Sequence, residues 1–86
     1  MSSAPESAAF QRATDPVLRL LTRQQIEALV AYQGEESLQA RIEELADKNS
    51  EGELTEDERA EYEGYVRANH FIATLQARAR KLLVET

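Results

Sequence analysis

Cysteine is absent from this chain of 86 residues, and glycine and proline occur only three times and twice, respectively. Without cysteine the chain forms neither disulfides nor a cysteine-ligated zinc site, which fits a cytoplasmic protein. Its apolar runs stay well short of the roughly 18 residues needed to cross a bilayer, so we expect no membrane partner. Few helix breakers, abundant helix-forming residues and no strand-type alternation predict an all-α fold.

A chain of this length forms one small domain at most, and its core alone gives only marginal stability. Small helical chains often gain stability by pairing, so a homodimer is one expectation. Residues 1–14 are mostly small, and they lack the basic and apolar regions of a signal peptide. We therefore predict a disordered leader at 1–14 and a single helical domain at 15–86.

The net charge of −6 is unevenly distributed along the chain. Residues 35–63 carry twelve acidic and three basic side chains, whereas residues 64–86 carry a net charge of +3. The acidic segment, with a net charge of −9, would repel phosphate, so nucleic acid is not an expected direct partner. It would attract a basic protein surface, although a solvated helix face explains the same charges without a partner.

Helical periodicity and capping signals predict three helices, at about residues 22–33, 35–48 and 56–84. Thr22 and Gln25 form a capping box at the start of the first helix, and Gly34 suits its end. Asp15 and Pro16 suit the start of a turn that either leads into this helix or stands alone. The third helix would reach about 43 Å at 1.5 Å per residue, longer than its neighbours. We therefore predict a small three-helix unit, a helical hairpin whose long C-terminal helix overhangs its own domain.

An apolar stripe follows the third predicted helix into its last turns. If that end overhangs the domain, its leucines are exposed unless a partner covers them. The residues that we expect in a partner interface are Tyr65, Ile72, Leu75, Ala79, Leu82 and Leu83. The last four are the expected hot spots.

The segment DKNSEGELTEDE, residues 47–58, is similar to the calcium-loop pattern D-x-[DN]-x-[DN]-G-x5-E. Its candidate calcium ligands are Asp47, Asn49, Glu51, Glu53 and Glu58. Three features disagree with an EF-hand: Glu51 stands where Asp or Asn is usual, Arg59 follows the twelfth position where an apolar residue is usual, and no second loop of this type is present.

The same letters have a second interpretation as two helix ends. Gly52 can close the second helix in a left-handed conformation, and Thr55 with Glu58 forms a T-x-x-E capping box that opens the third. We therefore expect a capped turn and no cofactor, with a single EF-hand-like calcium module as an alternative.

No set of side chains is arranged for catalysis. His70 is the only histidine and lacks a convincing set of metal-ligating neighbours, and Ser37 and Thr74 have no nearby histidine or lysine. We therefore expect no enzymatic activity.

Over about residues 20–83 the chain resembles a family of short, uncharacterised all-helical bacterial proteins, common in cyanobacteria and planctomycetes. A turn of the form ELADK-SEG-LT--E-AEYE and a tail of the form FIA-LQA-AR-LL carry the resemblance. Matching stretches are Leu21-Thr22, Glu44-Leu45-Ala46, Lys48, Glu51-Gly52, Leu54-Thr55, Glu58, Ala60-Glu61, Phe71-Ile72-Ala73, Leu75-Gln76 and Ala77-Arg78. The resemblance implies no known enzymatic activity, and it implies a gene neighbourhood shared with HNH-type nucleases.

These observations predict a small acidic protein–protein interaction module or regulatory subunit that docks through its long C-terminal helix, on itself or on a larger bacterial protein. One alternative is an inhibitor or accessory protein of a DNA-acting nuclease, which would use the acidic segment to cover a basic surface. The other alternative is the calcium-binding module at residues 47–58.

Overall fold

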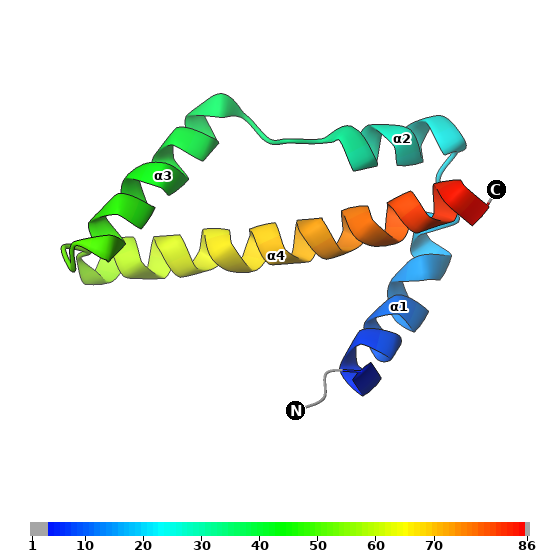
Figure 1. The fold of residues 1–86 in the computed structure, drawn as a ribbon, viewed down its shortest axis with the longest axis horizontal. Coiled ribbons are helices and arrows are strands. Elements are labelled where there is room, and N and C mark those ends of the chain that lie inside the picture. The colour runs from blue at the N-terminus through cyan, green and yellow to red at the C-terminus, as the bar shows by residue number, and fades with distance from the viewer. Residues whose placement is uncertain (1–3, 86) are drawn as a thin grey trace. The chain divides into compact units, whose positions relative to one another are not determined.

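Four α-helices make up residues 4–85, the part of the chain that this computed structural model describes (Figure 1). They are α1 (Ala4–Leu18), α2 (Arg23–Ala31), α3 (Glu36–Ser50) and α4 (Glu56–Glu85). Because these residues contain no strand, the predicted all-α class with a long C-terminal helix is confirmed. The chain divides into two compact units, a first unit of Met1–Tyr32 with Ala73–Thr86 and a second unit of Gln33–Ile72. The single domain predicted for residues 15–86 stays a prediction.

Helix α1 corrects the expectation of a disordered leader, because residues 4–14 are helical and residues 1–3 lie outside the described part. Pro16 lies inside this helix and does not begin it. Two long-range contacts hold the C-terminal end of α1. Leu18 is only 4% exposed, and the Asp15 carboxylate accepts two hydrogen bonds from Arg78 at 3.1 and 2.7 Å. Small residues without an apolar period gave no local signal for this packing.

Helix α2 begins at the predicted capping box. The Gln25 amide N–H donates to Thr22 Oγ1 at 3.1 Å, and the Thr22 N–H donates to Gln25 Oε1 at 2.9 Å. The end of α2 differs from the prediction, because Gly34, with φ 84°, lies beyond it in the connecting segment. The side-chain amide of Gln76 instead donates to the carbonyls of Leu29 and Tyr32, at 3.1 and 2.7 Å. A residue of α4 therefore pairs the Tyr32 carbonyl at the helix end and adds a second bond to the Leu29 carbonyl, which also accepts the Tyr32 N–H at 3.3 Å.

The core of the first unit lies between α1, α2 and the C-terminal part of α4. Its buried residues are Leu18, Ile26, Ala79 and Leu82, and Leu29, Val30, Leu75 and Leu83 pack against them. The predicted overhang of the long helix is therefore wrong. Helices α1 and α2 cover the last turns of α4, and α1 is the element that the sequence analysis had not placed there.

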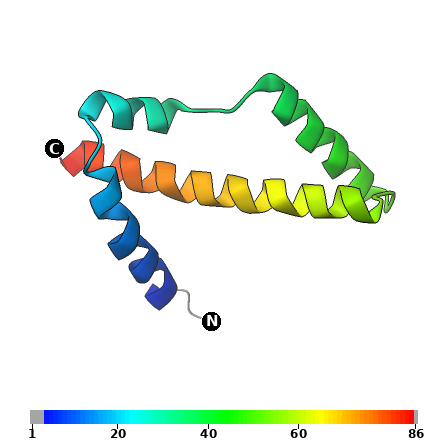
Figure 2. The same ribbon diagram turned by 180° about the vertical axis from the view of Figure 1, so that it is seen from behind.

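The second unit is a helical hairpin of α3 and the first half of α4, joined by a tight turn that Figure 2 shows from behind. Leu45 of α3 is completely buried in it. At the end of α3, the Glu53 N–H donates to the Lys48 carbonyl at 2.8 Å and the Gly52 N–H donates to the Asn49 carbonyl at 3.1 Å. With Gly52 at φ 71°, this pair of bonds is a Schellman motif.

Helix α4 starts with the predicted second capping box. The Glu58 N–H donates to Thr55 Oγ1, and the Thr55 N–H donates to Glu58 Oε1, both at 3.1 Å. The backbone groups at both ends of the turn are therefore paired by residues of the turn itself, without an ion.

Two glycines of the second unit should respond to alanine with opposite signs. Gly52→Ala places a side chain in the left-handed region and should lower the free energy of unfolding by about 1 kcal/mol. Gly64→Ala lies inside α4, where a Cβ meets no atom within 4 Å, and should raise it by about 0.5–1 kcal/mol. Urea unfolding followed by circular dichroism measures both. Changes of the same sign would contradict the assigned backbone conformations.

Candidate functional site

The six predicted interface residues do not form one exposed face. Tyr65 and Ile72 belong to the second unit and are half-buried. In the first unit, Ala79 is completely buried and Leu82 is 6% exposed, so both are core residues. Their expected exposure is therefore wrong, because α1 and α2 already cover them. Leu75 and Leu83 are half-buried against the same core.

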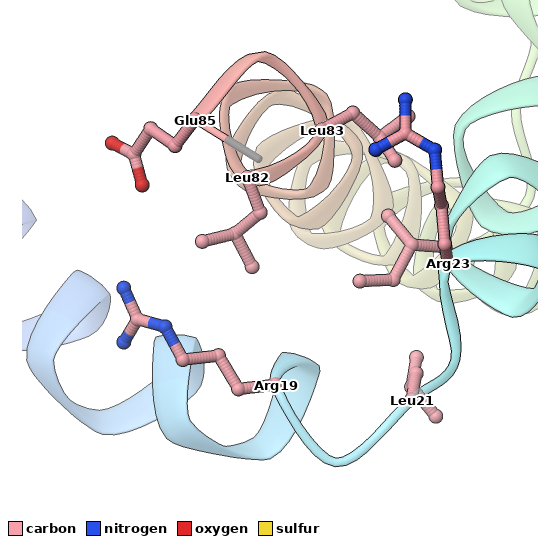
Figure 3. A pocket seen from close by; sticks show the side chains of 7 residues that line it. Arg19, Leu21, Arg23, Leu82, Leu83 and Glu85 are labelled. Carbon is pink, nitrogen blue, oxygen red and sulfur yellow. The ribbon is translucent and has the colours of Figure 1, made fainter.

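A cleft of about 410 Å³ opens at one end of the first unit, and we take it as the candidate functional site (Figure 3). One side comes from the last turns of α4, and the other from the connection after α1 and from α2. Its lining residues are Arg19, Leu21, Arg23, Ile26, Leu82, Leu83 and Glu85. Volumes of this size are typical of ligand-binding pockets.

Large exposed apolar side chains are close neighbours in sequence of the residues that line the cleft. Val17 and Leu20, near the end of α1, are 60% and 82% exposed, and Val84 in the last turn of α4 is 81% exposed. Leu21 lines the cleft and is 38% exposed. Sequence analysis missed this surface, although the run VLRLL at residues 17–21 carries too many apolar residues for one buried helix face.

The charged residues of the cleft are two guanidinium groups and one carboxylate. Arg23 forms an ion pair with Glu27 at 3.4 Å in which both side chains are more than half exposed. Arg19 forms no ion pair with a carboxylate of residues 4–85. The first unit carries six basic and four acidic residues, a net charge of +2, and the second carries four basic and twelve acidic, a net charge of −8. The cleft therefore lies in the basic part of an acidic protein.

The ion pair between Asp15 and Arg78 positions the α1 side of the cleft. It joins residues 63 positions apart, and both side chains are mostly shielded from solvent, at 14% and 16% exposure. The hydrogen bonds from Arg78 hold the pKa of Asp15 below its ordinary value, and the same bonds raise the pKa of Arg78. Both groups are therefore charged at neutral pH, and the two-pronged geometry fixes α1 against α4.

A second set of polar contacts lies between α3 and α4 in the second unit. Arg41 donates to both carboxylate oxygens of Glu61, at 3.0 and 2.9 Å, and contacts Glu44 at 3.1 Å. The Tyr65 hydroxyl also donates to Glu61, at 2.9 Å. Hydrogen bonds from Arg41 and then Tyr65 lower the pKa of Glu61, and the bond to Glu61 raises the pKa of Tyr65. Tyr65 therefore has a structural partner inside the unit.

The candidate calcium ligands are placed by helix ends and an ion pair. Asp47 and Asn49 lie on the last turn of α3, where residues two apart point about 200° from each other around the axis. Lys48 Nζ lies 2.7 Å from Glu58 Oε2, and this bond, followed by that from Thr55, lowers the pKa of Glu58. Glu51 and Glu53 are exposed. Within residues 4–85, no three histidine or acidic side chains come together as a potential metal site.

Comparisons with family profiles, with curated proteins and with solved structures find no match to this chain. The resemblance to short bacterial proteins therefore stays a prediction. Among the described helices, including the 30-residue α4, none has an apolar stretch that would cross a bilayer.

The ion pair of Asp15 should make stability depend on pH in a defined direction. Because its folded pKa is lowered, its contribution is complete above the ordinary aspartate pKa of about 3.9 and is lost as the pH falls through the folded value. Asp15→Asn should therefore lower the free energy of unfolding by about 1–2 kcal/mol at pH 7, and the difference from wild type should shrink towards pH 2. Thermal unfolding across this pH range measures it.

Glu27→Gln is the matched control, since it removes one carboxylate from an exposed ion pair of the same unit. Exposed pairs contribute little, so its effect should be well below that of Asp15→Asn. A constant difference between Asp15→Asn and wild type at every pH would contradict the assigned role of this carboxylate.

Proposed function

We propose that this chain is a cytoplasmic protein–protein interaction module, a regulatory subunit that docks a protein partner at the cleft of the first unit. One observation carries the proposal: the cleft has an apolar floor, and the residues next in sequence to its lining include Leu20 and Val84, which are 82% and 81% exposed. Contiguous exposed apolar surface typically marks an interaction site. Burying one such side chain contributes about 1.5–3 kcal/mol, so a few contacts here would support specific binding.

We retain one part of the docking hypothesis drawn from the sequence, namely that the end of α4 contacts the partner. The end of α4 contributes Leu82, Leu83 and Glu85, but it forms only one side, and the other side is formed by Arg19, Leu21, Arg23 and Ile26. Binding suits these lining residues better than catalysis. They include a single carboxylate, Glu85, and no hydroxyl, thiol, amine or imidazole that it would activate.

The test compares two aspartate substitutions at exposed apolar residues. Leu20→Asp should abolish capture of a partner from lysate of the native host, because a charge would be buried at the docking surface. Val66→Asp is the matched control, since Val66 is 49% exposed and belongs to the second unit. Affinity capture followed by mass spectrometry should identify a protein that is retained by wild type and by Val66→Asp and lost with Leu20→Asp.

Identical protein sets captured by all three forms would refute docking at the cleft. Light scattering on purified wild type tests self-association separately. Leu82→Asp is unsuitable for either test, because it would place a charge in the core of the first unit and destabilise the fold.

A second candidate function is the binding of a basic protein by the second unit, and the negative charge of this unit favours that function. Ten of the twelve acidic residues of this unit are exposed, and its net charge is −8. Such a surface suits a basic protein, for example an HNH-type nuclease that this chain would inhibit or assist. Glu36, Glu43 and Asp47 share one face of α3, at helical spacing.

Neutralising that face separates the two candidates. The triple substitution Glu36→Gln, Glu43→Gln and Asp47→Asn should weaken binding to a basic nuclease encoded beside this chain, and wild-type binding should fall steeply with salt. Co-purification at 50 and 500 mM NaCl measures both. Partner binding that is insensitive to salt and to the triple substitution, but lost with Leu20→Asp, would exclude this candidate.

A further inference from the structure

The cleft also indicates what kind of partner segment fits it, an inference that rests on the docking function proposed above. We propose that its occupant is an amphipathic acidic segment of a partner protein, which places apolar side chains in the cleft and carboxylates against Arg19 and Arg23. The floor and the rim of the cleft each restrict the occupant in a different way.

The floor selects apolar side chains. Ile26 and Leu82 are 7% and 6% exposed and belong to the core, and Leu21 and Leu83 complete the apolar lining. In Figure 3 the side chains of Leu82 and Leu83 extend from the α4 ribbon towards the side formed by Arg19, Leu21 and Arg23. A peptide backbone is too polar for this floor, so leucine-sized side chains have to enter it while the backbone stays at the rim.

The rim selects carboxylates. Arg19 forms no direct ion pair within residues 4–85, although its charge acts on Asp15, and the pair between Arg23 and Glu27 is so exposed that exchanging one carboxylate for another costs little. The two residues lie four positions apart, one after α1 and one at the start of α2. A guanidinium group binds a carboxylate through two parallel hydrogen bonds, which adds direction as well as attraction.

Glu85 is the third charged residue of the lining. It lies in the last turn of α4, where the carbonyl ends of the helix add negative potential. In Figure 3 its carboxylate and the Arg19 guanidinium lie on the same side of the cleft, whereas Arg23 lies on the other side, near Leu83. An occupant therefore meets a guanidinium group on either side of the cleft and one carboxylate, at Glu85.

Nucleic acid does not fit this combination. Phosphate binding depends on several cations acting together, whereas this cleft offers two guanidinium groups and one carboxylate in a unit of net charge +2. The apolar floor gives phosphate nothing to bind. An acidic segment of protein uses both the floor and the rim.

Two fluorescent peptides of equal length and helicity test the charge selection. Both carry leucine at positions i, i+3 and i+7, and the flanking positions are glutamate in one peptide and lysine in the other. By fluorescence anisotropy at 100 mM NaCl, the acidic peptide should bind the full chain at least tenfold more tightly than the basic one. Arg19→Glu with Arg23→Glu should reverse that preference.

Arg12→Glu with Arg80→Glu is the control, because it changes the net charge of the first unit equally at exposed residues that do not line the cleft. This control should leave the preference for the acidic peptide intact. A preference that survives the Arg19 and Arg23 reversal, or is lost equally in the control, would overturn the assignment of the rim.

The remaining outcomes separate this inference from the docking function. Equal binding of both peptides that Leu21→Asp abolishes would keep a docking cleft and overturn its charge selection. No binding of either peptide would overturn the inference, and the Leu20→Asp capture experiment would still decide the docking function. Concentration-dependent dimers of wild type that the Arg19 and Arg23 reversal dissociates would show that the occupant is a second copy, which also overturns the proposal.

Discussion

The apolar side of α4 has to be covered along a helix of 30 residues, and the rest of the structure depends on this constraint. At 1.5 Å per residue such a helix is about 45 Å long, more than α2 or α3 reaches. The chain covers it in two stretches. Helix α3 packs against the first half in the second unit, and α1 with α2 packs against the last turns in the first unit. The buried core of the first unit consists of Leu18, Ile26, Ala79 and Leu82. The small side chain of Ala79 lets the helices pack closely there.

Because α1, α2 and α3 cover the apolar side of α4, that side is not the main exposed apolar surface of the protein. The side chains that face inward from α4 are used by the chain's own core. Large apolar residues remain exposed near the ends of α1 and α4, above all Leu20 and Val84. A chain that buries so modest a core keeps some apolar surface exposed, and we propose that a partner covers it at the cleft.

Local signals predicted the helix ends, and long-range contacts decided the rest. The boxes at Thr22–Gln25 and Thr55–Glu58, and the glycine at position 52, act within a few residues and were visible in the sequence. The helix over residues 4–18 was not predicted, because residues 4–14 show no apolar period and the ion pair that holds its C-terminal end, between Asp15 and Arg78, spans 63 positions. The end of α2 was misplaced for the same reason, since Gln76 reaches it from α4. The sequence contained one sign of the candidate cleft, the apolar run VLRLL at residues 17–21. The structure was needed to show which of these side chains are buried and which are exposed.

The turn between α3 and α4 has one further consequence, which concerns the length of the chain there. Glu58 closes the capping box with one oxygen and binds Lys48 with the other, while the Lys48 carbonyl accepts the N–H of Glu53. Three bonds of different kinds thus converge on two residues ten positions apart. Inserting or deleting one residue in the helical parts of this stretch would rotate one partner by about 100° and break at least one bond. The number of residues between Lys48 and Glu58 is therefore more tightly constrained than the identity of the exposed acidic residues in this segment.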